Sequence, residues 1–187
     1  MATHICPWWM GYFLISPWRR RLQNPEKILS PYIKSGIKIL EIGPGMGFFT
    51  LSMARMVGDK GRIFAVDVQQ KMLASLEKRA AKAGLKNRIM ARPCSPTSLE
   101  IDDLSGTIDF AVAFAVMHEI PDQKAALESI MAALKPGGTL LISEPGKRVT
   151  RDEFQKTVSL AENCGFKKIS APQIKKNHSI DMIKPER

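Results

Sequence analysis

Short apolar runs alternate with helix-forming segments along most of this chain, and this alternation strongly constrains its fold. The runs have the length of buried β-strands and lie at residues 37–42, 62–66, 88–92, 108–116 and 139–143, and two further strand candidates follow at 167–170 and 179–183. Strands that are apolar on both faces are typical of parallel sheets, because the connecting helices cover both faces. The pattern therefore predicts an α/β fold, a Rossmann-like, doubly wound and mostly parallel sheet of seven strands.

Helical segments fill the intervals between these strands. Asn24, Pro25 and Glu26 form a helix-start signal for a helix expected over 25–34, and Thr150 with Glu153 stands at capping-box spacing before 151–163. Further helices are expected at 48–57, 69–83 and 121–134. The last two strands follow each other without a helix, so we expect an antiparallel hairpin at one edge of the sheet.

Length and cysteine content indicate one globular domain in a reducing compartment. The chain has 187 residues, about one domain, and its three cysteines, Cys6, Cys94 and Cys164, are widely spaced without any CxxC pair. His4 and His178 have no partner at metal-ligand spacing, so we expect no metal site. The longest apolar run is far below the roughly 20 residues of a membrane-spanning helix, and basic residues follow it rather than precede it. We expect a cytoplasmic protein.

The net charge of +10 is concentrated at the two ends of the chain. Residues 1–38 carry a net +5, residues 39–146 are neutral, and residues 147–187 carry another +5. A neutral body lacks the extended basic track that is typical of nucleic-acid binding. RNA binding therefore stays an alternative that the charge distribution disfavours.

The first residues form a segment of separate composition. All three Trp and both Tyr lie within the first 32 residues, together with Arg19, Arg20 and Arg21. We divide the chain into an aromatic and basic extension, residues 1–24, and a folded domain, residues 25–187. The large aromatic residues of the extension are Trp8, Trp9, Tyr12, Phe13 and Trp18. They can form a lid, stack on a planar substrate, enter a membrane interface, or simply cover an edge of the core.

A glycine-rich turn, residues 41–47, joins the first expected strand to the helix that follows it. It reads Glu-Ile-Gly-Pro-Gly-Met-Gly, and such glycines let a ligand approach the backbone beside free N–H groups. The nicotinamide fingerprint GxGxxG requires a glycine where this chain has Phe48. Asp67 ends the second expected strand, where a carboxylate can accept both hydroxyls of a ribose. Together these features predict a binding site for an adenosine-containing ligand that lacks a pyrophosphate. The alternative is that the turn is glycine-rich for steric reasons alone, and these features disfavour it.

Four motifs in order resemble the class I S-adenosylmethionine-dependent methyltransferases, especially their compact, ubiquinone-biosynthesis-like (type 11) branch. The motifs are ILEIGPGMGFF at 39–49, AVDVQQKML at 65–73, IDFAVAFAVMHEIPD at 108–122 and LKPGGTLLISEP at 134–145. The resemblance covers about residues 25–187, which would then be the methyltransferase domain. It implies the strand order 3-2-1-4-5-7-6, with the seventh strand antiparallel.

The resemblance also implies a set of binding residues for S-adenosylmethionine. The wall beside the methionine part would be formed by Glu41, Gly43, Pro44, Gly45 and Gly47. Asp67 would hold the ribose hydroxyls, with Val68 beside the adenine. The third family motif, commonly a glycine followed by an acid, is replaced by Arg92-Pro93-Cys94-Ser95, which makes Cys94 and Ser95 the candidates near the adenine. Ala113 and Phe114, at the end of the fourth strand, would contact the cofactor by backbone or packing.

Methyl transfer from a sulfonium is an in-line displacement, so the protein contributes mainly alignment and exclusion of water. His118 and Glu119, just past the fourth strand, are the candidates for a general base if the acceptor is a hydroxyl. The alternatives are that His118 bonds the loop backbone and that Glu119 is a solvated acid. Lys175 and Lys176 could join the basic extension in a rim that attracts an anionic substrate or surface.

We expect the chain to methylate a small or amphipathic, lipid-like acceptor and to release S-adenosylhomocysteine. Peripheral membrane contact fits the same expectation. An RNA methyltransferase and a non-catalytic S-adenosylmethionine-binding protein are the two alternatives.

Overall fold

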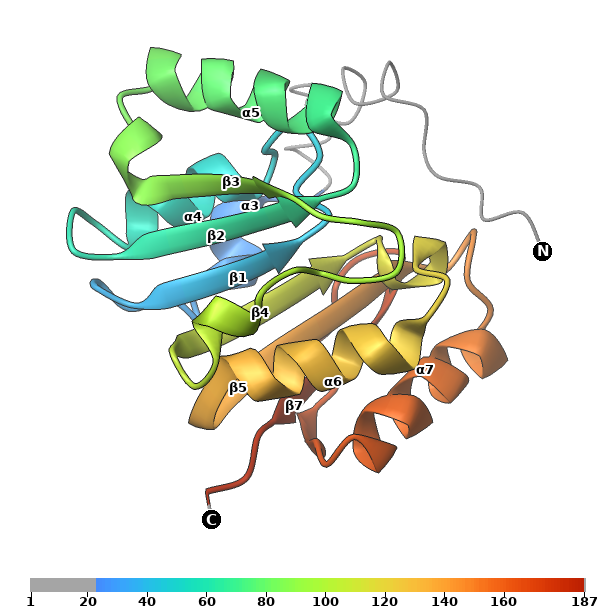
Figure 1. Cartoon of the computed structure of the whole chain (residues 1–187). Coiled ribbons are helices and arrows are strands. Elements are labelled where there is room, and N and C mark those ends of the chain that lie inside the picture. Colours follow the sequence, from blue (N-terminus) through green and yellow to red (C-terminus); the bar gives the residue numbers. More distant parts are fainter. Residues whose placement is uncertain (1–22, 187) are drawn as a thin grey trace. The chain divides into compact units, whose positions relative to one another are not determined.

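The structure, a computed structural model, describes residues 23–186 and is an α/β fold (Figure 1). Among these residues seven strands form a sheet in the order β3-β2-β1-β4-β5-β7-β6. Both the expected fold class and the strand order implied by the family resemblance are confirmed. The described residues divide into two compact units, and the division falls between Cys94 and Ser95.

The first unit, residues 23–94, is a three-stranded parallel sheet with its helices. Its elements are α3 (Pro25–Leu29), β1 (Lys38–Ile42), α4 (Thr50–Met56), β2 (Arg62–Asp67), α5 (Gln70–Lys82), η1 (Lys86–Arg88) and β3 (Ile89–Pro93). β2 pairs in parallel with both β1 and β3, and α4 and α5 both pack against it. Because β1 and β2 are almost wholly buried, the apolar runs that predicted them lack the polar alternation of a half-exposed strand.

Helix α3 is shorter than the segment 25–34 that the capping signals predict, because it ends at Leu29. The expected start is correct, since the Asn24 side chain accepts a hydrogen bond from the Lys27 N–H. Ser30 still has a helical backbone, with φ −56° and ψ −32°, but Pro31 after it has no N–H to continue the helix. The helix end was therefore wrong, because the proline outweighs the helix-forming residues after it.

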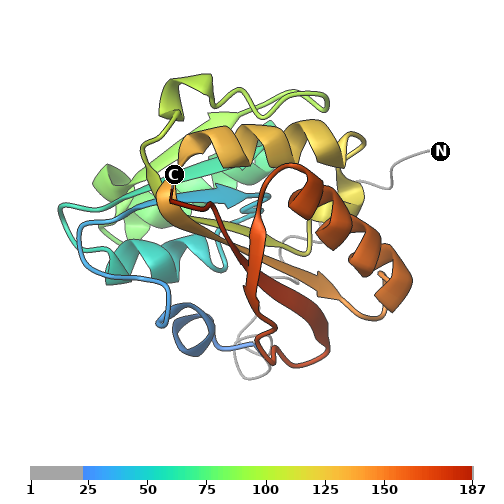
Figure 2. The same ribbon diagram turned by 90° about the horizontal axis from the view of Figure 1, so that it is seen from below.

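The second unit, residues 95–186, holds the other four strands. Its elements are η2 (Asp102–Leu104), β4 (Ile108–Phe114), η3 (Met117–Glu119), α6 (Gln123–Ala133), β5 (Leu134–Pro145), α7 (Arg151–Asn163), β6 (Lys167–Ser170) and β7 (Asn177–Ile183). β4 and β5 are parallel, whereas β7 is antiparallel to both β5 and β6, so the expected edge hairpin is confirmed (Figure 2). Helices α6 and α7 lie side by side along these strands (Figure 1).

Strand β5 and helix α7 show two different outcomes of local prediction. β5 begins at Leu134 rather than at 139, because Leu134 already pairs with Ile108 of β4. The pairing register then shifts, and the Lys-Pro-Gly-Gly segment lies between this pair and the next one, Phe110 with Thr139. α7 has the expected bounds, and both hydrogen bonds of the Thr150–Glu153 capping box are present. A short-range cap is therefore easier to predict than a strand register.

Expectations about residues 1–22 lie outside the described residues. These are the aromatic extension with its arginines, together with His4 and Cys6. Within the part of the chain that the structure describes, each helix is too short or too polar to cross a membrane.

Candidate functional site

The turn after β1 has a backbone that requires its glycines. Gly43, Gly45 and Gly47 have φ of 66°, 54° and 86°, values that residues other than glycine rarely adopt. The Gly43 N–H donates to the Val66 carbonyl at 2.9 Å, so the turn is attached to the end of β2. The glycine spacing in the sequence therefore reflects a left-handed loop at the carboxyl end of β1.

Gly45 and Gly47 differ in what surrounds them. A Cβ added at Gly47 would lie less than 3.0 Å from the Leu76 side chain, which is fully buried on α5. At Gly45, by contrast, no heavy atom of the described residues lies within 4 Å of such a Cβ. Gly47 thus serves the packing of the loop on α5, whereas Gly45 borders open space that a ligand can enter.

Asp67 holds the loop from the end of β2. Its Oδ2 accepts a hydrogen bond from the Gly45 N–H at 3.2 Å, and its Oδ1 accepts one from the Gln69 N–H at 2.9 Å. The side chain is buried, and burial raises the pKa of Asp67 while the backbone hydrogen bonds oppose that rise. The next residue, Val68, is an apolar side chain that stays 36% exposed.

Glu41 is a buried acid at the end of β1. Burial raises the pKa of Glu41 to about 8, although the neighbouring Thr50 hydroxyl opposes that rise. Within the described residues, the Glu41 Oε2 and the buried Thr50 Oγ1 make no hydrogen bond of good geometry. Buried polar atoms without partners are unfavourable and few in folded proteins, and at a loop bordering open space they are typical of a binding site. Pro44, which directly precedes Gly45 in the loop, is buried.

The residues of the third motif occupy the segment after β3. Cys94 is half-buried, and its N–H donates to the Asp67 carbonyl at 3.2 Å, which brings it to the same strand ends as Asp67. Ser95, the first residue of the second unit, closes a turn in which its hydroxyl accepts a hydrogen bond from the Ser98 N–H at 3.0 Å. The first unit therefore brings Cys94 together with Asp67, whereas the Ser95 side chain is used within its own turn.

The chain bends directly after β4. Ala113 and Phe114 are buried, and Ala115 has a φ of 58°, unusual for a residue with a side chain. The Ala115 N–H donates to the Ser143 carbonyl of β5 at 2.7 Å. This bend leads into η3, which carries His118 and Glu119.

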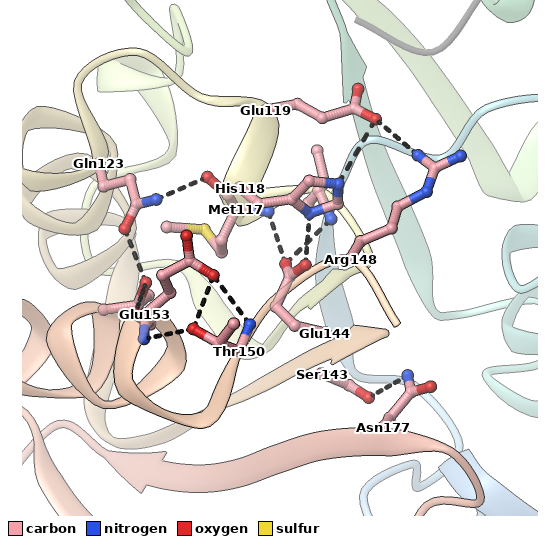
Figure 3. A network of polar contacts seen from close by, with 12 residues as sticks. Met117, His118, Glu119, Gln123, Ser143, Glu144, Arg148, Thr150, Glu153 and Asn177 are labelled. Carbon is pink, nitrogen blue, oxygen red and sulfur yellow. Dashed lines mark hydrogen bonds and ion pairs between the residues drawn. The ribbon is translucent and has the colours of Figure 1, made fainter. Parts of the chain in front are cut away.

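His118 is bound to a buried glutamate of β5 (Figure 3). Its Nδ1 lies 2.5 Å from Glu144 Oε2, and Glu144 Oε1 accepts the N–H groups of Val116 at 3.1 Å and Met117 at 2.8 Å. The bond to Glu144 raises the pKa of His118, against the opposite effect of burial. Glu144, rather than His118, therefore bonds the backbone of this loop. The alternative that His118 hydrogen-bonds the loop backbone is wrong, because its Nδ1 bonds Glu144.

Glu119 takes part in ion pairing. Its Oε1 lies 3.8 Å from the Arg148 guanidinium and 3.8 Å from His118 Nε2, and its side chain is 15% exposed. The description of Glu119 as a solvated acid is therefore wrong, because the turn and Arg148 enclose it.

Sequence reasoning did not single out Glu144, Arg148 and Gln123. Gln123 donates from Nε2 to the Met117 carbonyl at 3.0 Å, and the Thr157 hydroxyl of α7 donates to Gln123 Oε1 at 2.8 Å. A signal for Glu144 existed, since an acid directly follows an apolar run at a strand end, and buried acids need partners.

Comparison with known proteins identifies the family. Residues 33–183 match the family model described as a methyltransferase domain. The chain is 30% identical over 135 residues to the ubiquinone/menaquinone biosynthesis C-methyltransferase UbiE of Cellvibrio japonicus, covering 72% of this chain and 53% of that protein. The chain thus spans about half the length of the curated relatives it matches.

Solved structures share the fold. A SAM-dependent methyltransferase from Aquifex aeolicus superposes with a TM-score of 0.86 at 24% identity, covering 96% of this chain and all of that one (100%). The [4+2]-cyclase SpnF has a TM-score of 0.76 at 15% identity, covering 92% and 85% of the two chains. The second likeness means that this fold alone does not determine the reaction. The family match over 33–183 does identify the chain, which belongs to the methyltransferase-domain family.

Proposed function

We propose that this chain binds S-adenosylmethionine and transfers its methyl group to a small or amphipathic acceptor, releasing S-adenosylhomocysteine. The family membership supports the reaction. The observation that carries the cofactor assignment is the Gly45–Asp67 hydrogen bond at the open side of a loop whose neighbouring acid, Glu41, has an unpartnered buried oxygen.

These residues fit an adenosyl sulfonium. Asp67 is a carboxylate at a strand end, suited to ribose hydroxyls, and the exposed Val68 offers an apolar surface to the adenine. Glu41 Oε2 and Thr50 Oγ1 have hydrogen-bonding capacity left for the methionine part. When bound, S-adenosylmethionine supplies an activated methyl group. In this proposal Gly43, Pro44 and Gly47 form the wall of the site. Cys94, beside Asp67, contacts the nucleoside. The remaining proposed cofactor-binding residues are Ser95, Ala113 and Phe114.

An apolar acceptor with an anionic group, or one drawn from an anionic membrane surface, is the substrate class we favour. The relatives named for ubiquinone and menaquinone biosynthesis support a ring-bearing, lipid-like acceptor. In the second unit, exposed basic residues follow β5 and precede β7, and the Gly146 N–H donates to the Lys176 carbonyl at 3.0 Å, which joins the two loops. These residues are Lys147, Arg148, Lys175 and Lys176, the basic rim.

Calorimetric titration of the protein with S-adenosylhomocysteine and S-adenosylmethionine tests the cofactor assignment. We expect saturable one-to-one binding of both, no binding of NAD, and a large loss of affinity in Asp67→Ala. Asp59→Ala is the matched control, because Asp59 is an exposed acid of the same unit that pairs with Arg88. Absence of binding in the folded protein would overturn the proposal.

Radiolabelled methyl transfer then separates an enzyme from a non-catalytic binding protein. We expect label from S-adenosylmethionine in an organic-soluble product when extracted lipids and aromatic compounds are supplied. Label in RNA, or cofactor binding without any labelled product, would contradict the proposed acceptor class or the reaction itself.

A further inference from the structure

Glu41, in the first unit, is a buried acid without a counter-charge. It lies near the carboxyl end of β1 with only 4% of its surface exposed. Among the described residues no lysine or arginine forms an ion pair with it. The charged group that acts on it is a second acid, Asp67 of β2, which disfavours another negative charge nearby. A carboxylate in such a place loses its hydration without compensation, so the free protein holds Glu41 as the neutral acid.

The same carboxyl group belongs to the loop that borders open space. β1 and β2 are parallel, with Glu41 opposite Ala65, and Asp67 at the end of β2 accepts the Gly45 N–H at 3.2 Å. A Cβ at Gly45 would meet no heavy atom of the described residues within 4 Å. The Glu41 Oε2 makes no hydrogen bond of good geometry within the part of the chain that the structure describes. This buried oxygen therefore has bonding capacity for a ligand that enters beside Gly45.

A ligand with a cationic donor group would change the charge state of this acid. An opposite charge within about 4–6 Å favours the ionised form of a carboxyl, and a charge-assisted hydrogen bond strengthens that preference. The hydroxyl of Thr50, beside Glu41, acts in the same direction. In the proposed function Glu41 and Thr50 face the amino-acid part of the cofactor, which carries an ammonium group. The cofactor thus brings the counter-charge that the fold does not supply.

We propose that cofactor binding ionises Glu41, that each cofactor bound therefore releases one proton, and that the affinity of the site rises with pH. This inference rests on the proposed function and deepens it. The O–H bond of the Glu41 carboxyl breaks, its electron pair stays on the oxygen, and the proton passes to the solvent. The ammonium group of the ligand then neutralises the carboxylate that forms. Glu41 is in this way a protonation switch of the cofactor site.

The pH dependence has a defined sign. Thr50 of α4 and Asp67 of β2 are the groups that act on Glu41 from the neighbouring elements. Burial raises the pKa of Glu41 to about 8, the Thr50 hydroxyl opposes this rise, and the charge of Asp67 adds to it. Below that value binding includes the cost of removing the proton. The affinity should therefore rise roughly tenfold per pH unit between about pH 5.5 and 7, and level off above the pKa of Glu41.

A ligand without the ammonium group separates this proton from other effects of binding. 5′-Methylthioadenosine has the nucleoside and the thioether of S-adenosylhomocysteine but lacks the amino-acid part. It leaves Glu41 without a counter-charge, so its binding should release no proton. Any change in the protonation of Asp67 caused by the ribose occurs with both ligands and cancels in the comparison.

The experiment counts protons by isothermal titration calorimetry in buffers of different ionisation enthalpy. Titrations with S-adenosylhomocysteine and with 5′-methylthioadenosine are run at about pH 6.5, where an α-amino group, which titrates near pH 8, is still cationic. Infrared difference spectroscopy of the same titrations follows the carbonyl stretch of a protonated carboxyl group. Both readouts are independent of turnover.

Support would be about one proton released per S-adenosylhomocysteine, none with 5′-methylthioadenosine, and loss of a protonated-carboxyl band with the first ligand alone. In Glu41→Gln, S-adenosylhomocysteine should release no proton, and its affinity should stay constant between about pH 5.5 and 7. Glu77→Gln is the matched control, because it makes the same change at an exposed acid of α5 and should behave as the unmodified protein.

Other results overturn the proposal. Binding of S-adenosylhomocysteine without proton release, an equal release with 5′-methylthioadenosine, or a release that persists in folded Glu41→Gln would each refute the proton coupling and leave the proposed function intact. A folded protein that does not bind S-adenosylhomocysteine refutes the proposed function itself. If Glu41→Gln does not fold, the proton count and the infrared band of the unmodified protein still decide the question.

Discussion

Replacement of Gly47 by alanine should destabilise the protein far more than the same change at Gly45. Both glycines have left-handed backbones, so each alanine adds a conformational penalty of roughly 1–2 kcal/mol. At Gly47 the new Cβ would also collide with the side chain of Leu76, which is fully buried and cannot move without disturbing its neighbours. Overpacking of this kind adds roughly 1–3 kcal/mol.

The expected loss of unfolding free energy is therefore roughly 2–5 kcal/mol for Gly47→Ala and roughly 1–2 kcal/mol for Gly45→Ala. In a chain of this size about 1 kcal/mol lowers Tm by roughly 2–4 °C, so Gly47→Ala should melt roughly 2–12 °C below Gly45→Ala. The order reverses for ligand affinity, because only Gly45 borders open space.

Urea and thermal unfolding of the two variants, followed by circular dichroism, measure the difference, and Leu76→Ala in each background isolates its cause. The collision predicts a favourable coupling of about 1–3 kcal/mol between Gly47→Ala and Leu76→Ala, and none with Gly45→Ala. Equal stability losses in the two single variants, or no coupling to Leu76, would refute the packing argument for Gly47.

Three further outcomes are expected. Native Glu41, with a pKa of about 8, keeps a proton that the unfolded chain releases above about pH 4.5, so stability falls as pH rises from 4.5 to 8. Glu41→Gln should flatten this decline in urea midpoints measured across that range, and an identical decline in both proteins would contradict the burial of the acid. Thr150→Ala should lower the unfolding free energy by about 0.5–2 kcal/mol, because it removes the hydroxyl that accepts the Glu153 N–H and donates to the Glu153 carboxylate; a Tm equal to that of the exposed-loop variant Thr97→Ala would contradict this. The double variant Lys175→Gln, Lys176→Gln should weaken binding to phosphatidylglycerol vesicles by about 30-fold in cosedimentation, at about 1 kcal/mol per lysine. The control is the double variant Lys82→Gln, Lys86→Gln, which changes two exposed lysines outside the basic rim and should not weaken this binding. Equal effects of the two double variants would exclude the basic rim as the membrane-facing surface.

Features set by neighbours in the sequence could be predicted, and features set by distant contacts could not. The bounds of α7 follow from a cap that spans three residues, and β1, β2 and β4 follow from apolar runs that are buried on both faces. The end of α3 was also predictable in principle, since Pro31 is sufficient to stop it.

The candidate site shows the same division. The glycine loop and Asp67 carry their signal in residue type and in their place at strand ends. The partner of His118 is Glu144, 26 residues away on the next strand, and only the register of β4 with β5 brings the two together. The distinct tasks of Gly45 and Gly47 likewise depend on where Leu76 of α5 lies, which no local pattern specifies.

A crystal structure of the protein with S-adenosylhomocysteine tests the central claim most directly. The proposal predicts the ligand over the Gly43–Gly47 loop, with its ribose hydroxyls on the Asp67 carboxylate and its amino-acid part toward Glu41 and Thr50. A ligand bound elsewhere, or an Asp67 that still bonds only Gly45 and Gln69 while the ligand is present, would contradict it.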